Sequence, residues 1–232
     1  LMKAKLDAGR ALLYQCARYV DIYKALDDIS RERKLTPEER KEQKLYAKLA
    51  DSLTPLAKGM NSEYANQNTY DALQIHGGSG FMMDYPIQRY YRDARITSIY
   101  EGTTQLQVVA AIRYVTNGSY LAQMREFEQA EVAPEWASIQ ERARSMADKF
   151  EQAVARVKEA GDAAYHDLCA RHLMEMAADI IMLHLLLHNA NANAELFGKS
   201  VRVYANFVEA EIARHHTFVM NLTPADVADY QA

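Results

Sequence analysis

The chain has few of the residues that build cross-linked, sheet-rich or membrane-spanning proteins. Only 2 of its 232 residues are cysteines, Cys16 and Cys169, which argues against a disulfide framework and is typical of a reducing compartment. Glycine occurs 9 times and proline 5 times, and β-branched runs are few, so helices are favoured over sheets. No secretory signal and no run of about 20 apolar residues is present, so neither export nor membrane insertion is indicated.

The sequence also lacks a large excess of charge. Lys and Arg number 27 against 31 Asp and Glu, which gives a formal net charge of -4. This balance does not indicate binding to nucleic acid or to an anionic membrane, and we expect neither as a partner. Hydrophobic residues make up 49% and charged residues 25%, which is ordinary for a globular protein that buries one large core or two small ones.

The first helical pattern covers residues 1–28. Its apolar or small residues recur at alternating steps of three and four, which predicts one helix with a single buried stripe made of Leu6, Gly9, Leu13, Cys16, Val20 and Tyr23. A charged connector is expected over residues 30–35. Leu1 stands inside the helical pattern with no N-cap before it, so we expect the chain to be a fragment of a longer polypeptide.

A second helix has a clear start signal. Thr36 supplies an N-cap, Pro37 suits the first helical position, and two glutamates follow in the first turn. The pattern predicts a helix that runs to Gln74 or His76. Pro55 is expected to kink this helix or to break it.

The rest of the chain reads as helices separated by short polar breaks. After a loop at residues 77–86, the pattern predicts two short and three long helical segments, over residues 87–95, 103–115, 119–160, 162–192 and 195–221. Asn117-Gly118 is expected to cap the end of one helix, Pro134 to break another, and Pro224 to end the last. We therefore expect an all-α protein in two parts, residues 1–117 and residues 118–232.

Two pairs of possible metal ligands lie on the later helices. His172 and Glu175 are three residues apart, and Glu211 and His215 are four apart, so each pair shares a helix face. A di-metal site in a helical bundle needs about four carboxylates and two Glu-x-x-His units, and this order and count do not match. We predict ordinary polar helix faces here and no metal site.

The most informative stretch for function is residues 70–107. Gly77, Gly78 and Gly80 follow an apolar helical run, and glycines there permit φ > 0, end a helix and let backbone approach a ligand. A plain helix C-cap explains the same glycines.

Downstream, three arginines alternate with aromatic and acidic residues at Arg89, Arg92 and Arg95. This pattern favours a helix held by ion pairs between its turns. Glu101 lies where that helix would stop, with Thr103 placed to cap the next one. The local pattern alone favours a surface acid near a helix N-terminus.

Taken together, these segments resemble the C-terminal helical domain of flavin-dependent acyl-CoA dehydrogenases. The resemblance rests on residues 74–80, Tyr85-Pro86, residues 91–95 and residues 99–105, in that family's order and at about its spacing, and it extends over residues 1 to about 117. It implies an antiparallel four-helix bundle of which residues 1–28 form the second helix, the first being absent. Residues 119–232 resemble the extra helical region of a longer bacterial-type branch.

The resemblance implies α,β-dehydrogenation of an acyl-CoA thioester, as in fatty acid β-oxidation, with FAD as the electron acceptor. Glu101 matches the base that removes the α-proton, and its carboxylate is expected to be dry and walled by aliphatic groups. The Glu101 backbone N–H is expected to hydrogen-bond the thioester carbonyl. Tyr100 and Gly102 are expected to shape the substrate pocket beside it.

The resemblance also implies a set of cofactor contacts and partners. Thr103 and Gln105 match positions that touch FAD in the same subunit, whereas a second group matches a loop that reaches the FAD of a neighbouring subunit: Gln74, Ile75, His76, Gly77 and Gly78. Cofactor binding then requires a homodimer or a homotetramer, and a substitution at Gly78 is expected to strain this loop.

An electron-transferring flavoprotein is the implied acceptor, and the bacterial cytoplasm or the mitochondrial matrix is the implied location. The fragment alone is expected to be inactive. The alternative is a non-catalytic helical oligomerisation or scaffold module that keeps the fold.

Overall fold

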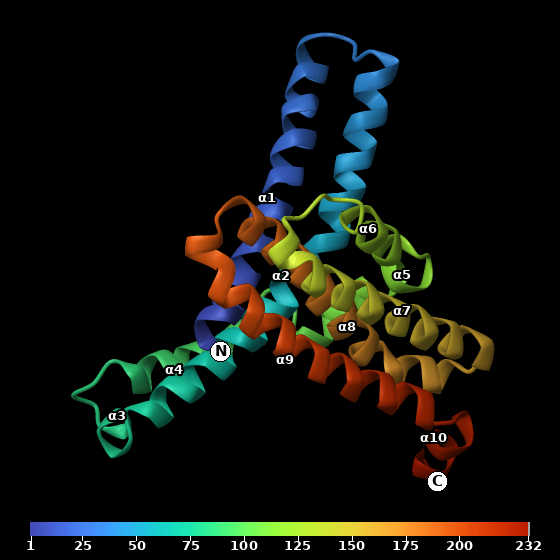
Figure 1. The fold of residues 1–232 in the computed structure, drawn as a ribbon. Coiled ribbons are helices and arrows are strands. Elements are labelled where there is room, and N and C mark those ends of the chain that lie inside the picture. Colours follow the sequence, from blue (N-terminus) through green and yellow to red (C-terminus); the bar gives the residue numbers. More distant parts are fainter. Residues whose placement is uncertain (232) are drawn as a thin grey trace.

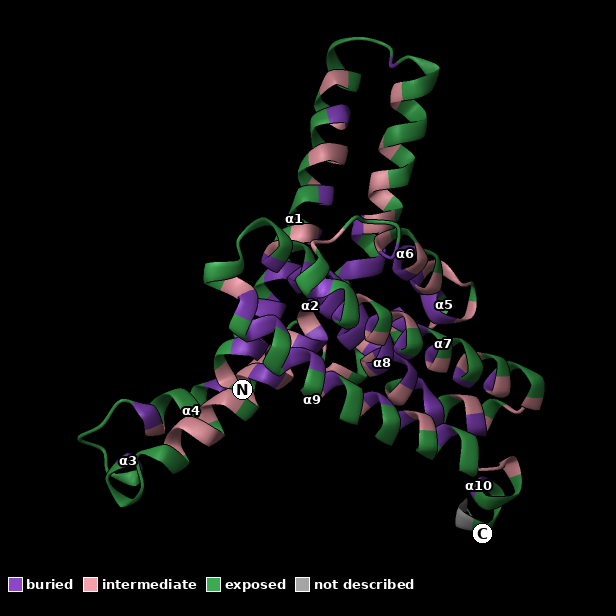
Figure 2. Ribbon diagram, viewed as in Figure 1, coloured by how far each residue is buried: buried purple, intermediate pink, exposed green. Residues whose placement is uncertain are grey.

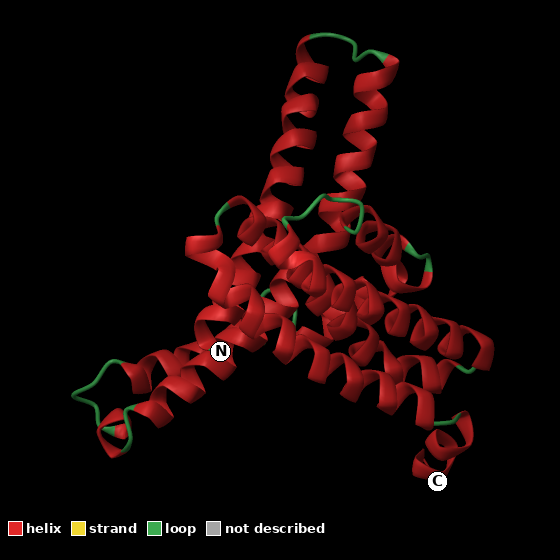
Figure 3. Ribbon diagram, in the orientation of Figure 1, coloured by secondary structure: helices red, strands yellow, loops and turns green. Residues whose placement is uncertain are grey.

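The structure is a computed structural model that describes residues 1–231 of the chain. It is helical throughout, and no β-strand occurs among these residues (Figure 3). The α-helices are α1 Met2–Glu32, α2 Pro37–Ile75, α3 Gly78–Phe81, α4 Ile87–Thr97, α5 Thr104–Thr116, α6 Ser119–Phe127, α7 Ala137–Ala160, α8 Ala163–Ala192, α9 Ala194–Asn221 and α10 Pro224–Gln231. A short 3-10 helix, Pro134–Trp136, precedes α7. The predicted all-α class is confirmed.

Two arms project from a helical body. The end of α1 and the start of α2 form an antiparallel hairpin at the top of Figure 1, and the end of α2 forms a second arm with α3 and α4. The body consists of α7, α8 and α9 packed on one another and on α1 and α5. Buried residues concentrate in this body, whereas both arms are mainly exposed (Figure 2).

The central helix of the body is α8. Every residue from Met176 to Leu187 is buried, because α1, α5, α6, α7 and α9 all contact this helix. By length and composition α8 could cross a membrane, and 83% of its apolar window is buried inside the fold. A soluble core helix meets the same criteria, and packing on several sides explains why α8 lacks a polar face. One continuous apolar core runs from Ala4 to Val227, so both predicted parts of the chain contribute to it.

The start of α2 follows the sequence signal. The Thr36 hydroxyl accepts a hydrogen bond from the Glu39 N–H at 3.2 Å, and the Glu39 carboxylate accepts one from the Thr36 N–H at 2.8 Å. This reciprocal pair satisfies two amides that the first turn leaves free. The helix then runs without interruption past Pro55 to Ile75, so Pro55 does not break it.

Three predicted boundaries were wrong. α1 continues to Glu32, four residues beyond its expected end at residue 28, and the expected loop at residues 77–86 contains the one-turn helix α3. Pro224, which was expected only to end the last helix, begins the further helix α10. Its missing N–H is harmless at a helix start, where the preceding Thr223 accepts a hydrogen bond from the Asp226 N–H at 3.4 Å and donates its own N–H to the Asp226 carboxylate at 2.8 Å.

The predicted buried stripe of α1 was also partly wrong. Leu6 and Leu13 are 46% and 50% exposed, whereas Ala8 and Leu12 are fully buried. The reason is that α1 contacts α8 and α9 as well as α2, so its buried face is wider than a single stripe. Small residues such as Ala4, Ala8 and Ala11 lie on this face, where they allow the helices to pack closely. Even the polar Asp7 is buried, where it accepts a hydrogen bond from the Ser200 hydroxyl of α9 at 2.5 Å.

Candidate functional site

Glu101 lies in a tight loop between α4 and α5. The backbone N–H groups of Ile99 and Tyr100 donate to the Ile96 carbonyl at 2.9 and 3.0 Å, which closes the end of α4. Glu101 then takes φ +52°, and it is the one non-glycine residue with positive φ among residues 1–231. Gly102 follows at φ +92°. A left-handed glutamate is unfavourable by itself, so neighbouring contacts must hold it.

Lys58, in the middle of α2, supplies that restraint. Its ammonium group donates to the carbonyl of Thr97 at 2.8 Å and to the carbonyl of Gly102 at 2.6 Å, and so bridges the two sides of the loop. The Gln107 amide also reaches the Gly102 carbonyl, at 3.4 Å. The Thr103 hydroxyl accepts from the Leu106 N–H at 3.3 Å and begins α5, as expected. The sequence patterns did not identify Lys58, since it is one of four lysines in α2 and a lysine in a helix gives no signal of a distant partner.

The immediate surroundings of Glu101 differ from those expected. Glu101 and Tyr100 are exposed, so residues 1–231 do not provide the dry, aliphatic walls that were expected around the carboxylate. No hydrogen bond from the Glu101 backbone N–H is made within this range. The loop therefore presents a carboxylate and a free amide N–H on the same residue. Any further walls would have to come from groups outside this range.

In the turn after α2, the glycines that need their lack of a side chain are not the ones that were predicted. Gly77 has the positive φ of +59°, and its N–H donates to the Gln74 carbonyl at 3.0 Å. Gly80 is the site of close approach, because a Cβ there would lie 2.8 Å from the Leu73 carbonyl oxygen. Gly78 has neither property, since its φ is not positive and a Cβ would meet nothing within 4 Å. The expected strain at Gly78 was therefore wrong.

The remaining predicted residues of this turn lie at the surface. Gln74, Ile75, His76, Gly77 and Gly78 are all exposed, and Ile75 is 73% exposed. They are separated from Thr103 and Gln105 by α4, whose 11 residues span about 16 Å. The structure therefore does not join the two predicted cofactor-binding groups into one cradle.

The arginines of α4 do not form the ion pairs that their spacing suggested. Arg92 lies 3.7 Å from its neighbour Asp93, and both side chains are exposed. Arg95 instead donates to the Ser98 hydroxyl, and Arg89 lies over the Tyr90 ring. No ion pair between turns of α4 is found in the described part of the chain. These arginines leave most of their hydrogen-bonding capacity unused.

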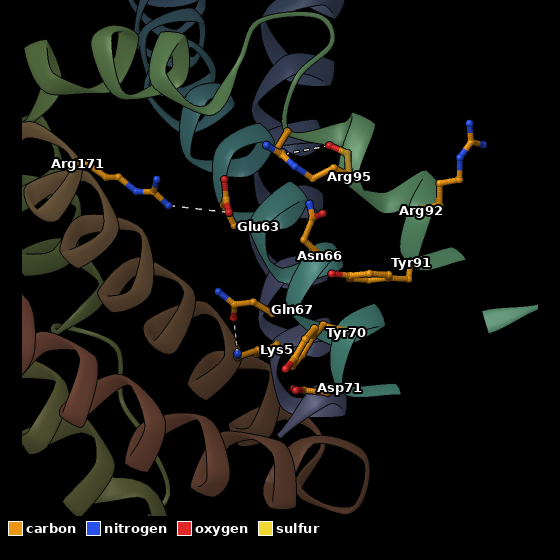
Figure 4. A pocket seen from close by; sticks show the side chains of 11 residues that line it. Lys5, Glu63, Asn66, Gln67, Tyr70, Asp71, Tyr91, Arg92, Arg95 and Arg171 are labelled. Atoms are coloured by element: carbon orange, nitrogen blue, oxygen red, sulfur yellow. Dashed lines mark hydrogen bonds and ion pairs between the residues drawn. The ribbon is translucent and has the colours of Figure 1, made fainter. Parts of the chain in front are cut away.

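An open cleft of about 940 Å³ lies between α4, the start of α1, the second half of α2 and Arg171 of α8 (Figure 4). Lys5 and Gln67 are hydrogen-bonded across it at 2.6 Å, and Arg171 lies 3.9 Å from Glu63. Arg92 points outward from the cleft in this view. The cleft is polar and of mixed charge, and neither Glu101 nor the glycine turn lines it.

A buried polar cluster joins α2 to α8 and α9. The hydroxyls of Tyr64 and Tyr204 donate to the Asp179 carboxylate at 2.6 and 3.1 Å. Burial raises the pKa of the Asp179 carboxyl to about 7, and the two tyrosine hydrogen bonds oppose this rise only in part. Lys5 lies over the Tyr64 ring, and burial lowers the pKa of its ammonium group.

The histidine–glutamate pairs that we examined as metal ligands meet at one place between α8 and α9. His172 and His215 face each other through their Nδ1 atoms at 2.7 Å, while Glu175 and Glu211 approach the opposite nitrogen of His215 at 3.2 and 3.9 Å. The four groups do not converge on one point. No group of three or more metal-ligating side chains with suitable geometry occurs among the described residues.

Family models account for nearly the whole chain. Residues 1–114 match the model described as "Acyl-CoA dehydrogenase, C-terminal domain", and residues 116–227 match "Acyl-CoA dehydrogenase C terminal". The two matches meet at residue 115, in the last turn of α5.

Curated relatives agree with this result. The chain is 52% identical over 64 residues to the broad-specificity linear acyl-CoA dehydrogenase FadE5 of Mycobacterium tuberculosis, an alignment that covers 28% of this chain and 10% of that protein. It is 57% identical over 54 residues to the acryloyl-CoA reductase (NADH) of Anaerotignum propionicum, covering 23% and 14%. The chain thus spans a minor part of the length of these relatives.

Solved structures share the arrangement of helices. An acyl-CoA dehydrogenase of Bacillus anthracis complexed with FAD matches 94% of this chain and 40% of its own, with a TM-score of 0.68 and 22% identity. ACDH-11 of Caenorhabditis elegans in complex with C11-CoA matches 89% and 34%, with a TM-score of 0.64 and 20% identity. At these identities the likeness concerns the fold alone.

Proposed function

Since this chain belongs to the acyl-CoA dehydrogenase family, as its C-terminal helical region, we propose that it supplies the catalytic base and part of the cofactor contacts of an FAD-dependent enzyme that acts on acyl-CoA thioesters. The observation that carries this proposal is the Glu101 loop. Its backbone is held in an unfavourable conformation by Lys58, whose hydrogen bonds fix the carbonyl groups on either side of Glu101. Strain that distant residues maintain is typical of functional positions.

In the proposed reaction, the Glu101 carboxylate removes the α-proton of the thioester, and its free backbone N–H donates to the thioester carbonyl, where negative charge develops. A bound FAD would supply the acceptor for the hydride of the β-carbon, and the product would then be the α,β-unsaturated thioester. Tyr100 and Gly102 flank the acid and limit how the substrate approaches it. Exclusion of water from the Glu101 carboxylate has to come from other parts of the enzyme.

The residues of this chain suit contact with a flavin cofactor at two places. The backbone at Gly77 and Gly78 is open, with no atom within 4 Å of a built Cβ, so another molecule can approach it closely. Thr103 and Gln105 are exposed at the start of α5. Because the two groups lie at opposite ends of α4, we propose that they contact two different FAD molecules in a homodimer or homotetramer.

The acceptor and the location follow from the same family membership. We propose an electron-transferring flavoprotein as electron acceptor, and the bacterial cytoplasm or the mitochondrial matrix as location. Both cysteines, Cys16 and Cys169, are buried and free, which suits a reducing compartment.

The test uses the holoenzyme that carries this chain. Glu101→Gln should retain FAD and lose flavin reduction by acyl-CoA by a factor on the order of 10² to 10⁴, because the amide cannot accept the α-proton. Flavin bleaching in stopped flow measures this rate. Glu135→Gln, at an exposed acid remote from the loop, is the matched control. Near-normal bleaching in Glu101→Gln would contradict the assignment of the base.

The isolated chain should be inactive. It carries part of the contacts to FAD, and affinity falls steeply when contacts are lost. Purified residues 1–232 should therefore contain no flavin absorbance. The alternative function, a non-catalytic scaffold module, predicts instead that Glu101→Gln in the holoenzyme leaves flavin reduction unchanged.

A further inference from the structure

Thr104, the first residue of α5, ties the Glu101 loop to α2. Its backbone N–H donates to the Ser98 carbonyl at 3.1 Å, and its hydroxyl donates to the Glu63 carboxylate at 2.6 Å. The start of α5 does not need this hydroxyl as a cap, because the side chain of Thr103 already caps the helix. The hydroxyl therefore fixes the start of α5, and with it the end of the loop, relative to α2.

The other oxygen of the Glu63 carboxylate faces α8. It lies 3.9 Å from the guanidinium group of Arg171, whose Nε donates to the Glu175 carboxylate at 2.7 Å (Figure 4). The Glu63 side chain is 26% exposed, and a carboxylate that is largely removed from water needs hydrogen-bonding or charged partners. Thr104 and Arg171 supply them, one at each oxygen.

A packing contact joins the same helices one turn earlier in α2. A Cβ at Gly59 would lie 2.5 Å from the methyl carbon of Met174 and 3.4 Å from the Cβ of Gln107, so α8 and α5 both approach α2 closely here. Gly59 directly follows Lys58, and Lys58 and Gln107 both donate to the Gly102 carbonyl. The helix α8 therefore packs against the part of α2 that holds the loop.

These contacts cross between the two family matches. Arg171 and Met174 lie within residues 116–227, whereas Glu63 and Glu101 lie within residues 1–114. We propose that Glu63 is a positioning residue for the candidate base: it anchors the loop through Thr104, and α8 holds Glu63 in turn through Arg171. The C-terminal helices thereby keep Glu101 in its working geometry. This inference rests on the proposed function, in which Glu101 removes the α-proton.

The first test replaces Thr104 in the holoenzyme that carries this chain. Thr104→Val keeps the branched shape without the hydroxyl and should slow flavin reduction by acyl-CoA about tenfold, since a displacement of about 1 Å in a reacting group can cost on the order of 10². Thr104→Ser restores the hydroxyl and should react at close to the parent rate. The half-saturating acyl-CoA concentration should not change, because Thr104 positions the base and does not bind substrate. Rates are taken per bound flavin, so that a loss of folded enzyme does not lower them.

Glu63→Leu tests the same hydrogen bond from α2. It should slow flavin reduction by a factor similar to that of Thr104→Val. The double variant should be little slower than either single variant, because both changes remove one shared interaction.

Arg171→Met tests the support from α8. Flavin reduction should slow about 2- to 5-fold, since a partly exposed ion pair contributes little by itself. Hydrogen exchange over residues 98–104 should become faster. Arg142→Met is the matched control, because Arg142 forms an ion pair with Glu209 between α7 and α9, outside these contacts.

Three results would each overturn this inference: a parent rate in Thr104→Val, additive losses in the double variant, or equal behaviour of Arg171→Met and Arg142→Met. If Glu101→Gln is slow while any of these results is obtained, the proposed function stands and the positioning role of Glu63 fails. Near-normal flavin reduction in Glu101→Gln removes both.

Discussion

Glu101 is held in a backbone conformation that side-chain-bearing residues rarely adopt. A left-handed non-glycine residue costs roughly 1–2 kcal/mol. The Lys58 hydrogen bonds on either side of it offset this cost, because they anchor the carbonyls of Thr97 and Gly102 to α2. Lys58 precedes the two residues that accept its hydrogen bonds by 39 and 44 positions. The position of the candidate base therefore depends on a residue far earlier in the chain.

Lys58→Met should loosen the loop without removing Glu101. The variant loses two hydrogen bonds from a charged donor, and each such bond contributes about 1.5–3 kcal/mol. Water can then hydrogen-bond the two carbonyl groups instead. We expect a lower melting temperature, retained FAD, and flavin reduction in the holoenzyme slowed roughly tenfold or more, because a misplaced base is an inefficient one. Lys48→Met, at an exposed position of the same helix, is the control. Identical behaviour of the two variants would show that Lys58 does not position the loop.

Asp179 makes the stability of the chain depend on pH. Its carboxyl has a pKa of about 7 in the fold against 3.8 ordinarily, so between these values the folded chain binds one more proton than the unfolded chain. The free energy of unfolding then falls as the pH rises from about 4 to about 7, by up to roughly 1.4 kcal/mol per pH unit from this group. His172 and His215 act in the opposite direction, since burial lowers the pKa of each.

Asp179→Asn should remove this contribution, because the amide keeps the shape and does not ionise. Relative to the parent, the variant should gain roughly 2–3 kcal/mol in unfolding free energy between pH 5 and pH 7, while the histidine contributions cancel in the comparison. Denaturant unfolding at the two pH values measures the difference. Asp51→Asn, at an exposed position of α2, should show no such change. A constant difference between Asp179→Asn and its parent would mean that Asp179 is ionised throughout.

At the scale of elements, the arm formed by α2, α3 and α4 depends on two different glycines for two different reasons. Gly77 turns the chain with its positive φ, and Gly80 lets α3 pack against the end of α2. The arm is otherwise exposed and has few buried side chains, since Gly80, Ile87, Ala94 and Ser98 are the buried residues between positions 71 and 100. Segments with so little burial open locally at low cost.

Gly80→Ala should therefore destabilise this arm, whereas Gly78→Ala should not. The new methyl at position 80 would lie 2.6 Å from the His76 Cβ as well as 2.8 Å from backbone, and relieving such overlap typically costs about 1–3 kcal/mol. Position 78 offers open space, so its change stays within roughly 0.5 kcal/mol. Hydrogen exchange over residues 70–90 measures the difference. Equal exchange in both variants would mean that α3 does not need its close contact with α2.

At the scale of the whole molecule, large apolar side chains gather on that same arm. Phe81 is 78% exposed and Met83 89% exposed, and Tyr85 and Tyr90 are 44% and 53% exposed. Leu6 and Leu13 of α1 add further exposed apolar area elsewhere. Exposed apolar surface of this kind marks regions that associate with other protein.

We expect the chain to form a dimer or tetramer in solution, with a light-scattering mass at least twice that of the 26.4 kDa monomer. Phe81→Ser combined with Met83→Ser should weaken the association, because each buried side chain of this size contributes roughly 1.5–3 kcal/mol. Leu168→Ser, at an exposed leucine of α8, is the control. A monomer at micromolar concentrations would contradict the proposed assembly.

Local chemistry accounts for most of the helix boundaries. The Thr36 capping box, the glycine after α2 and the threonine before α5 each act within a few residues, and so the starts and ends that they mark could be predicted. The errors at Glu32, at α3 and at Pro224 arose where a short pattern permitted both helix and loop. The place of Glu101 between α4 and α5 was predicted in the same local way.

The sequence by itself thus determined that the chain is helical, where its main helices lie and which segment carries the candidate base. Only the tertiary structure decided which face α1 buries, that Lys58 holds the Glu101 loop, and that Asp179 meets Tyr64 across 115 positions of sequence. Helix periodicity and capping depend on neighbours within about four residues, which the sequence displays directly. The chemical state of a buried side chain depends on what the fold packs against it, and those partners come from helices far apart in the chain.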